Sequence, residues 1–256
     1  MRRWLLVLGC AMACLLLGAA GAGAAGEPRE MVIGASQGGV PLIVYSLGDG
    51  SRRVLVLGGQ HGGPEANTVR LAEAVLEYFA EGDLPPGVGL DVLTVANPDG
   101  LASGSRQFLS GVDPNRNWGG SDWRADAYDS NAQFRSGLGG SEPFSDQETR
   151  ALADWILEHR PAFVVNYHSA GGFMFGPRDG LAGELSNAYA DASGYRWPQP
   201  GAPSPLPYAT SGSMNVWLRE VGIPGILVEL STPQNSEIER NLAGLAAAMS
   251  RLAETD

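Results

Sequence analysis

Short apolar runs alternate along the chain with longer segments whose apolar residues recur every three or four positions. The runs predict strands at Glu30–Ser36, Pro41–Leu47, Arg53–Gly59, Leu90–Ala96, Ala162–Tyr167 and Ile226–Leu230. Several are apolar at successive positions, which is typical of strands that are buried on both faces of a sheet.

The helical period is clearest at Ala66–Ala80, Asp146–His159 and Ser236–Thr255, and Ser145 precedes the second helix as a candidate cap. Strands that alternate with such helices predict an α/β fold: one domain with a mostly parallel or mixed central sheet, covered by helices on both faces. Ligands bind sheets of this kind beyond the carboxyl ends of the strands.

Residues 1–24 have the layout of a signal peptide. Arg2 and Arg3 precede an uncharged run that is most apolar at Trp4–Leu17 and ends in small residues. We therefore expect residues 1–24 to be removed, and residues 25–256 to form one domain that is secreted, periplasmic or otherwise in the cell envelope. The alternative is an uncleaved membrane anchor.

Acidic residues outnumber basic ones, with 28 Asp+Glu against 17 Lys+Arg and a formal net charge of −11. A surface of this charge repels phosphate backbones and anionic lipids. We therefore expect no nucleic-acid partner and no stable membrane insertion after signal cleavage. Both cysteines, Cys10 and Cys14, fall in the signal segment. Residues 25–256 thus offer no disulfide, no thiolate ligand and no cysteine nucleophile.

Three predicted strands each end on a side chain that can catalyse a reaction or bind a metal. His61 follows the third strand through a glycine-rich turn, His168 follows the fifth strand, and Glu229 lies near the end of the sixth. The carboxyl ends of parallel strands meet at one edge of a sheet, so these side chains can converge despite their separation in sequence.

Residues 61–65 read His-Gly-Gly-Pro-Glu, which places Glu65 in the first turn of the helix that follows His61. With His168, these side chains supply the three protein ligands that a catalytic zinc site requires. His159, the remaining histidine, ends a predicted helix, where a cation favours the helix dipole. The alternative is that His61 and His168 are structural histidines beside a glycine-rich turn.

Six motifs, in chain order, resemble those of the zinc metallocarboxypeptidase family, including its bacterial branch of murein peptide amidases. They are Gly58–Thr68, Asn97–Gly100 with Arg106 and Gly111–Trp118, Ser141–Thr149, Asn166–Ser169, Tyr208–Gly212 and Val228–Leu230. The resemblance implies a metallocarboxypeptidase-like fold for residues 25–256 and one Zn²⁺ per chain.

The resemblance also implies which residues hold the metal. His61, Glu65 and His168 match the zinc ligands, and Glu229 matches the catalytic glutamate, which acts as general base towards water. Three residues separate His61 from Glu65, where the commonest family motif has two; this longer spacing also occurs in bacterial members. The alternative is a two-histidine site completed by a different carboxylate.

Further matches imply how a substrate is bound. Arg106 resembles the arginine that stabilises the developing oxyanion, and Asn115 with Arg116 resembles the pair that binds the terminal carboxylate. Tyr208 resembles the tyrosine that closes over the substrate. Alignment places Asn215 near the floor of the side-chain pocket, where its polar amide fits a polar or zwitterionic side chain such as diaminopimelate.

Together these matches predict an exported zinc metallopeptidase that removes a C-terminal residue from peptides or murein peptides with a free C-terminal carboxylate. One alternative is a murein peptide amidase that cleaves γ-D-Glu–diaminopimelate bonds. Another keeps the zinc chemistry and hydrolyses N-acyl amino acids, as aspartoacylase-like relatives do.

Two alternatives belong to other classes. A non-catalytic cell-wall binding protein would use the aromatic residues Trp118, Trp123, Tyr128 and Phe134 to stack on sugars. A serine hydrolase would use Gly34–Gly38, which fits the G-x-S-x-G pattern. This segment lies between two predicted strands, and no histidine occurs late in the chain, so we interpret it as a hairpin turn.

Overall fold

The structure is a computed structural model that describes residues 26–255, and the predicted signal peptide at 1–24 lies outside the described residues. A seven-stranded sheet in the order β1-β2-β4-β3-β7-β9-β8 forms its centre. The strands are β1 (Arg29–Ala35), β2 (Pro41–Leu47), β3 (Arg52–Leu57), β4 (Val88–Leu93), β7 (Phe163–Ser169), β8 (Phe173–Phe175) and β9 (Gly225–Leu230). Within residues 26–255, no helix is long and apolar enough to cross a membrane.

The middle of the sheet is parallel and its margins are antiparallel. On β3, Val56 lies opposite Val92 of β4 on one side and opposite Val165 of β7 on the other, and β7 continues in parallel to β9. β1, β2 and β8 join with antiparallel pairing. The sheet is therefore mixed, as expected, and β3, β7 and β9 end at the same edge.

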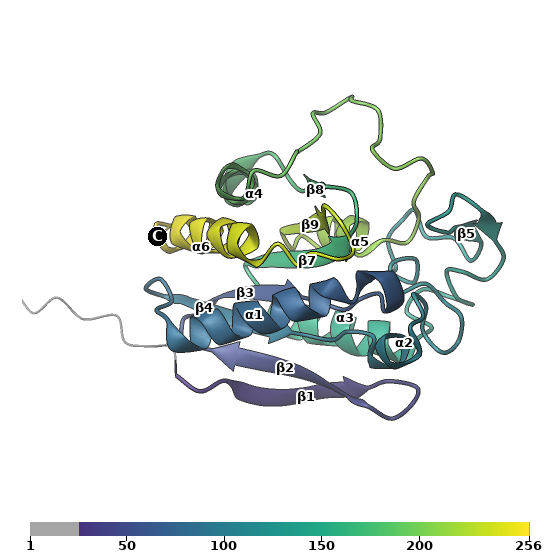
Figure 1. Ribbon diagram of the computed structural model, residues 1–256, viewed down its shortest axis with the longest axis horizontal. Helices are drawn as coiled ribbons and strands as arrows, with labels where there is room; N and C mark the ends of the chain where they lie inside the picture. Colours follow the sequence, from purple (N-terminus) through teal and green to yellow (C-terminus); the bar gives the residue numbers. More distant parts are fainter. Residues whose placement is uncertain (1–25, 256) are drawn as a thin grey trace, which may run out of the picture.

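Helices cover both faces of the sheet (Figure 1). One face carries α1 (Asn67–Glu81), α4 (Gly180–Ser193) and α6 (Ile238–Ala253), and the other carries α3 (Gln147–His159) and α5 (Met214–Glu220). On β3, Val54 and Val56 pack in the first layer, whereas Leu55 and Leu57 pack in the second. Burial on both faces explains why these strands read as continuous apolar runs.

The predicted strands and helices all occur, with ends shifted by a few residues. The predicted cap at Ser145 is wrong, because Asp146 is the N-cap and α3 begins at Gln147. The Ser145 hydroxyl instead accepts a hydrogen bond of 2.8 Å from Asn117 Nδ2, which draws this side chain into the preceding loop.

The sequence pattern did not predict several elements, most of them short. These are the 3₁₀ turn η1 (Gly63–Glu65), α2 (Pro98–Ser103), the hairpin β5 (Ala127–Tyr128) and β6 (Phe134–Arg135), strand β8, and helices α4 and α5. Figure 1 shows the loop near residue 200 passing from the α4 side towards the β5 hairpin. Together with the strand ends, these elements enclose the candidate site.

Candidate active site

Two glycines turn the chain after β3 and bring His61 to the sheet edge. Gly59 has φ of +59°, a left-handed conformation that L side chains rarely adopt. A Cβ atom on Gly62 would lie 2.2 Å from the carbonyl carbon of Gly100, so only glycine fits there. The turn enters η1 (Gly63–Glu65), which contains a proline in its first positions. Glu65, the last residue of η1, is buried and contacts His61.

The Nδ1 atoms of two histidines converge on the carboxylate of Glu65. His61 Nδ1 lies 2.9 Å from Oε1, His168 Nδ1 lies 3.0 Å from Oε2, and the two Nδ1 atoms are 3.2 Å apart. All three side chains are buried. Two imidazoles and one carboxylate are the donor set of a catalytic zinc site, so the residues predicted to bind zinc fit one Zn²⁺ ion.

The opposite nitrogen of each imidazole is held by a buried side chain. His61 Nε2 lies 2.9 Å from Asp113 Oδ1, and His168 Nε2 lies 3.1 Å from Asn166 Nδ2. The contact of His61 suits a metal ligand, because its Nε2–H can donate to the Asp113 carboxylate and leave Nδ1 free for the metal. The contact of His168 with Asn166 fixes the orientation of that ring. Arg106 Nε donates to Asp113 Oδ2 at 2.9 Å and so anchors that carboxylate in turn.

The charges in this cluster favour metal binding. Burial opposes the ionisation of Glu65 and Asp113, yet neighbouring cationic groups, with Arg106 among them, hold both pKa values well below the ordinary value. Burial lowers the pKa of His168 and keeps its ring neutral near pH 7, as a metal ligand must be. Burial also acts to lower the pKa of His61, but Glu65 and Asp113 raise it overall.

Glu229 lies beside the cluster, on the strand next to His168. The two residues are directly opposite each other in the register of β7 and β9. Burial, followed by the negative charge of Glu65, raises the pKa of Glu229 to about 7. A carboxyl group with this pKa can accept a proton and return it near neutral pH.

Arg106 connects the metal ligands to their outer contact. Its Nη1 bonds to Glu65 Oε1, while its Nε bonds to Asp113. The sequence linked Arg106 to the site only through the spacing of a motif. The structure places its guanidinium in contact with the zinc ligand Glu65. Arg106 also lines the cavity, where it can donate to an oxygen atom of a bound substrate.

Asn115, Arg116 and Tyr208 line the same cavity. Arg116 is only 2% exposed, and its Nε and Nη1 donate to the carbonyl oxygens of Tyr128 at 3.1 Å and Asn115 at 2.8 Å. Its guanidinium carbon lies 5.7 Å from the centroid of the Tyr208 ring. Asn115 Oδ1 accepts from the backbone N–H of Met214 at 2.9 Å, which joins this wall to the start of α5.

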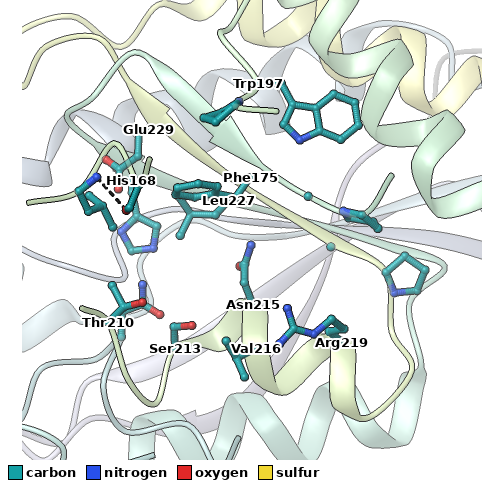
Figure 2. A pocket seen from close by; sticks show the side chains of 18 of the residues that line it. His168, Phe175, Trp197, Thr210, Ser213, Asn215, Val216, Arg219, Leu227 and Glu229 are labelled. Carbon is teal, nitrogen blue, oxygen red and sulfur yellow. Dashed lines mark hydrogen bonds between the residues drawn. The ribbon is translucent and has the colours of Figure 1, made fainter. Parts of the chain in front are cut away.

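The cavity has a volume of about 670 Å³ and extends well beyond the zinc ligands. Figure 2 shows His168 and Glu229 at one end, Phe175 and Leu227 along the middle, and residues of α5 farther on. Asn215, which alignment placed in the side-chain pocket, lies on this α5 wall. The zinc ligand His168 and the predicted substrate-binding residues therefore share one continuous space.

Sequence reasoning missed four polar residues of the site. Asp113 lies inside a quoted motif, and Asn166 lies two positions before His168 on β7, hence on the same face of that strand. Both residues could therefore have been identified from their positions in the sequence. Arg178 and Arg219 also line the cavity, but no motif or period marks them in the sequence.

The G-x-S-x-G segment forms the turn between β1 and β2, as predicted. Ser36 Oγ accepts a hydrogen bond from the backbone N–H of Val40 at 3.1 Å, and the carbonyl oxygen of Ser36 accepts from Gly39. The serine is buried at this turn, far in the sheet order from β7 and β9. Its hydroxyl therefore stabilises a hairpin.

His159 has the structural position that the sequence predicted for it. It lies in the last turn of α3, where Nδ1 is 2.9 Å from the carbonyl oxygen of Trp155. Its ring stacks on the Trp155 indole with 4.3 Å between ring centroids. These contacts hold His159 on α3, apart from the zinc cluster.

Comparison with known proteins agrees with this geometry. Residues 28–247 match the zinc carboxypeptidase family, peptidase M14. Murein peptide amidase A of Escherichia coli strain K12 is 30% identical over 207 residues, which cover 78% of this chain and 80% of that protein.

Solved structures show the same architecture. Murein-tripeptide amidase from Escherichia coli O157 superposes with a TM-score of 0.70 at 29% identity, covering 91% of this chain and 94% of that chain. Carboxypeptidase A from Helicoverpa armigera superposes with a TM-score of 0.66 at 18% identity, covering 90% of this chain and 70% of that chain. The second likeness concerns the fold alone.

Proposed function

The chain belongs to the zinc carboxypeptidase family, and on that premise we propose that it removes the C-terminal residue from peptides with a free terminal carboxylate. One observation carries this proposal. The buried cation Arg116 lines the same cavity as Glu229 and the zinc ligand His168. A terminal carboxylate bound there would place the last peptide bond near the zinc site.

A zinc ion on His61, Glu65 and His168 would polarise the scissile carbonyl and acidify a water molecule. Glu229 then accepts a proton from the attacking water and returns it to the nitrogen of the departing amino acid. Burial raises the pKa of Glu229 above its ordinary value, which makes its carboxylate a better proton acceptor.

Arg106 stabilises the negative charge that develops on the carbonyl oxygen. Its guanidinium is fixed by Asp113 and lies against Glu65, so it is oriented before the substrate arrives. A donor held in place in this way loses little energy to reorganisation during the reaction.

Asn115 and Arg116 bind the terminal carboxylate, and Tyr208 covers the bound residue. A planar guanidinium can donate two parallel hydrogen bonds to a carboxylate, and burial strengthens them. Protein carbonyls take up only part of the donor capacity of Arg116, which has five N–H groups. Since Arg116 lines the cavity, we expect its remaining donors to bind the terminal carboxylate.

A murein peptide is the second candidate substrate. The support is 30% identity to a murein peptide amidase and the polar residue Asn215 in the side-chain pocket. We also propose that residues 1–24 are a cleaved signal peptide and that the enzyme acts outside the cytoplasm, in the cell envelope or the medium.

Mass spectrometry of a mixed substrate pool tests these proposals. The pool contains peptides with free C-termini, the same peptides as C-terminal amides, and the murein tripeptide, each with zinc-loaded and with chelated protein. Loss of one residue from the free-ended peptides only, abolished by the chelator, is the expected result. Cleavage of the tripeptide alone would favour the murein amidase, and no cleavage by protein shown to hold zinc would refute both.

A further inference from the structure

The far half of the cavity carries positive charge that the proposed reaction does not use. Among residues 26–255, four arginines line the cavity, whereas Glu229 is the only acidic residue that does. Two of them, Arg106 and Arg116, are assigned to the reacting bond and the terminal carboxylate. The other two have no such role: Arg178 lines the cavity beside Trp197, and Arg219 lines it from α5.

Arg219 enters the cavity from α5. It lies four residues after Asn215, so the two side chains project from the same face of the helix. Figure 2 shows both directed towards the interior, on the side of the cavity away from His168 and Glu229. The ion pairs of the described residues include no carboxylate bound to Arg219.

Arg178 is held in the wall formed by the segment around Trp197. Its guanidinium carbon lies 4.0 Å from the centroid of the Trp197 ring, and its Nη2 donates to the carbonyl oxygens of Trp197 and Pro198. Stacking on an indole leaves the edge of a guanidinium free to donate. Among residues 26–255 no carboxylate forms an ion pair with it.

The path between the zinc site and these cations is apolar. Phe175 and Leu227 line it, and Figure 2 places them between the zinc end and Asn215. Asn215 lines this path from α5. The lining thus suits a side chain with an aliphatic stem and a polar, negatively charged tip.

We propose that Arg219 and Arg178 bind a carboxylate at the tip of the substrate's terminal side chain, so that the enzyme prefers a dicarboxylic terminal residue. This inference rests on the proposed carboxypeptidase function and names the substrate class of that site. Glutamate, 2-aminoadipate and diaminopimelate share this chemistry.

The test compares peptides that differ only in their last residue. Glutamate and glutamine have the same shape, and only glutamate is charged. For the zinc-loaded enzyme we expect kcat/KM to be about 10- to 100-fold higher for the glutamate peptide, the range of one to two hydrogen bonds to a charged group. Arg219→Gln should bring the ratio close to one, and Arg219→Glu should reverse the preference towards a terminal lysine.

Arg70→Gln is the matched control, because Arg70 is exposed on α1 and does not line the cavity. It removes the same charge and should leave the ratio unchanged. Equal rates for glutamate and glutamine in the wild type would overturn the inference while leaving the carboxypeptidase intact.

A binding measurement separates this inference from the proposed function. Free glutamate and free glutamine, the products of the two peptides, are titrated while the fluorescence of Trp197 and the other tryptophans is recorded. Tighter binding of glutamate that disappears in Arg219→Gln would support the pocket even if no peptide were cleaved. Equal binding of the two amino acids would refute the pocket, whatever the activity.

Discussion

The zinc end and the side-chain end of the cavity are built from different parts of the chain. At the zinc end, the buried side chains of His61, Glu65 and His168 lie within hydrogen-bond distance of one another next to the ends of β3 and β7, and Glu229 lies beside them on β9. At the other end, Asn215 and Arg219 lie on the seven-residue helix α5, opposite the irregular segment around Trp197. The residues of the proposed chemistry are thus positioned by the sheet, whereas the residues of the proposed specificity lie on elements that can change without disturbing the sheet.

Removing a zinc ligand should have the largest effect of all. His168→Ala leaves two protein ligands, too few for a catalytic zinc site, so activity and bound zinc should both be lost. Metal analysis of the purified variant measures this. His159→Gln is the control and should retain one zinc per chain, since His159 contacts Trp155 on α3. Full activity of His168→Ala would refute the assigned ligand set.

Glu229→Gln should lower kcat by about 10²- to 10⁴-fold, the usual contribution of a general acid–base group. The amide has nearly the same shape but cannot accept the proton. Zinc content and the thermal midpoint should stay close to those of the wild type, because Glu229 contributes no metal-binding atom to the cluster. A variant with unchanged kcat would mean that another group is the base.

Asp113→Asn should weaken zinc binding by about 10- to 100-fold, as is usual for the outer contact of a histidine ligand. The amide holds His61 Nε2 less strongly and no longer neutralises Arg106. Competition with a chelator measures the zinc affinity. Asp83→Asn, at an exposed position, is the control with the same chemical change. Equal affinities in the two variants would contradict this role.

The pH profile should report on Glu229. Its pKa is raised to about 7, so the fraction of ionised base increases as the pH rises through that value. A bound dication favours the carboxylate and moves this transition downwards. We therefore expect kcat/KM to fall about tenfold per pH unit below an acid limb at or below pH 7. A limb well above pH 7 in the zinc enzyme would contradict this assignment.

The smallest effect on activity is expected for Tyr208, which lies in the loop before α5. Tyr208→Phe keeps the ring, whose centroid lies 5.7 Å from the Arg116 guanidinium carbon, and removes only the hydroxyl. It should raise KM by about fivefold or less, the value of one ordinary hydrogen bond, with kcat nearly unchanged. Steady-state kinetics on a free-ended peptide measures both constants. A loss of kcat as large as that of Glu229→Gln would assign Tyr208 to proton transfer. The catalytic residues would then not be confined to the zinc end of the cavity.

The sheet was predictable because burial on both faces leaves an unmistakable apolar run in each central strand. The long helices were predictable because one apolar stripe recurs over many residues in α1 and α6. In contrast, α5 is too short for a period to stand out. The strand β8 has only three residues, and its place is decided by its antiparallel pairing with β9.

The sequence by itself determined the zinc chemistry, because His61, Glu65 and His168 occur in motifs whose order implies their roles. Only the tertiary structure decided what surrounds them. The contact of His61 with Asp113 joins residues 52 positions apart, and local sequence carries no record of such a pairing. Arg219 reads as an ordinary arginine in the last turn of a helix until the packing of α5 directs it into the cavity. Local propensity acts over a few residues, whereas the cavity forms only when distant segments close around the strand ends.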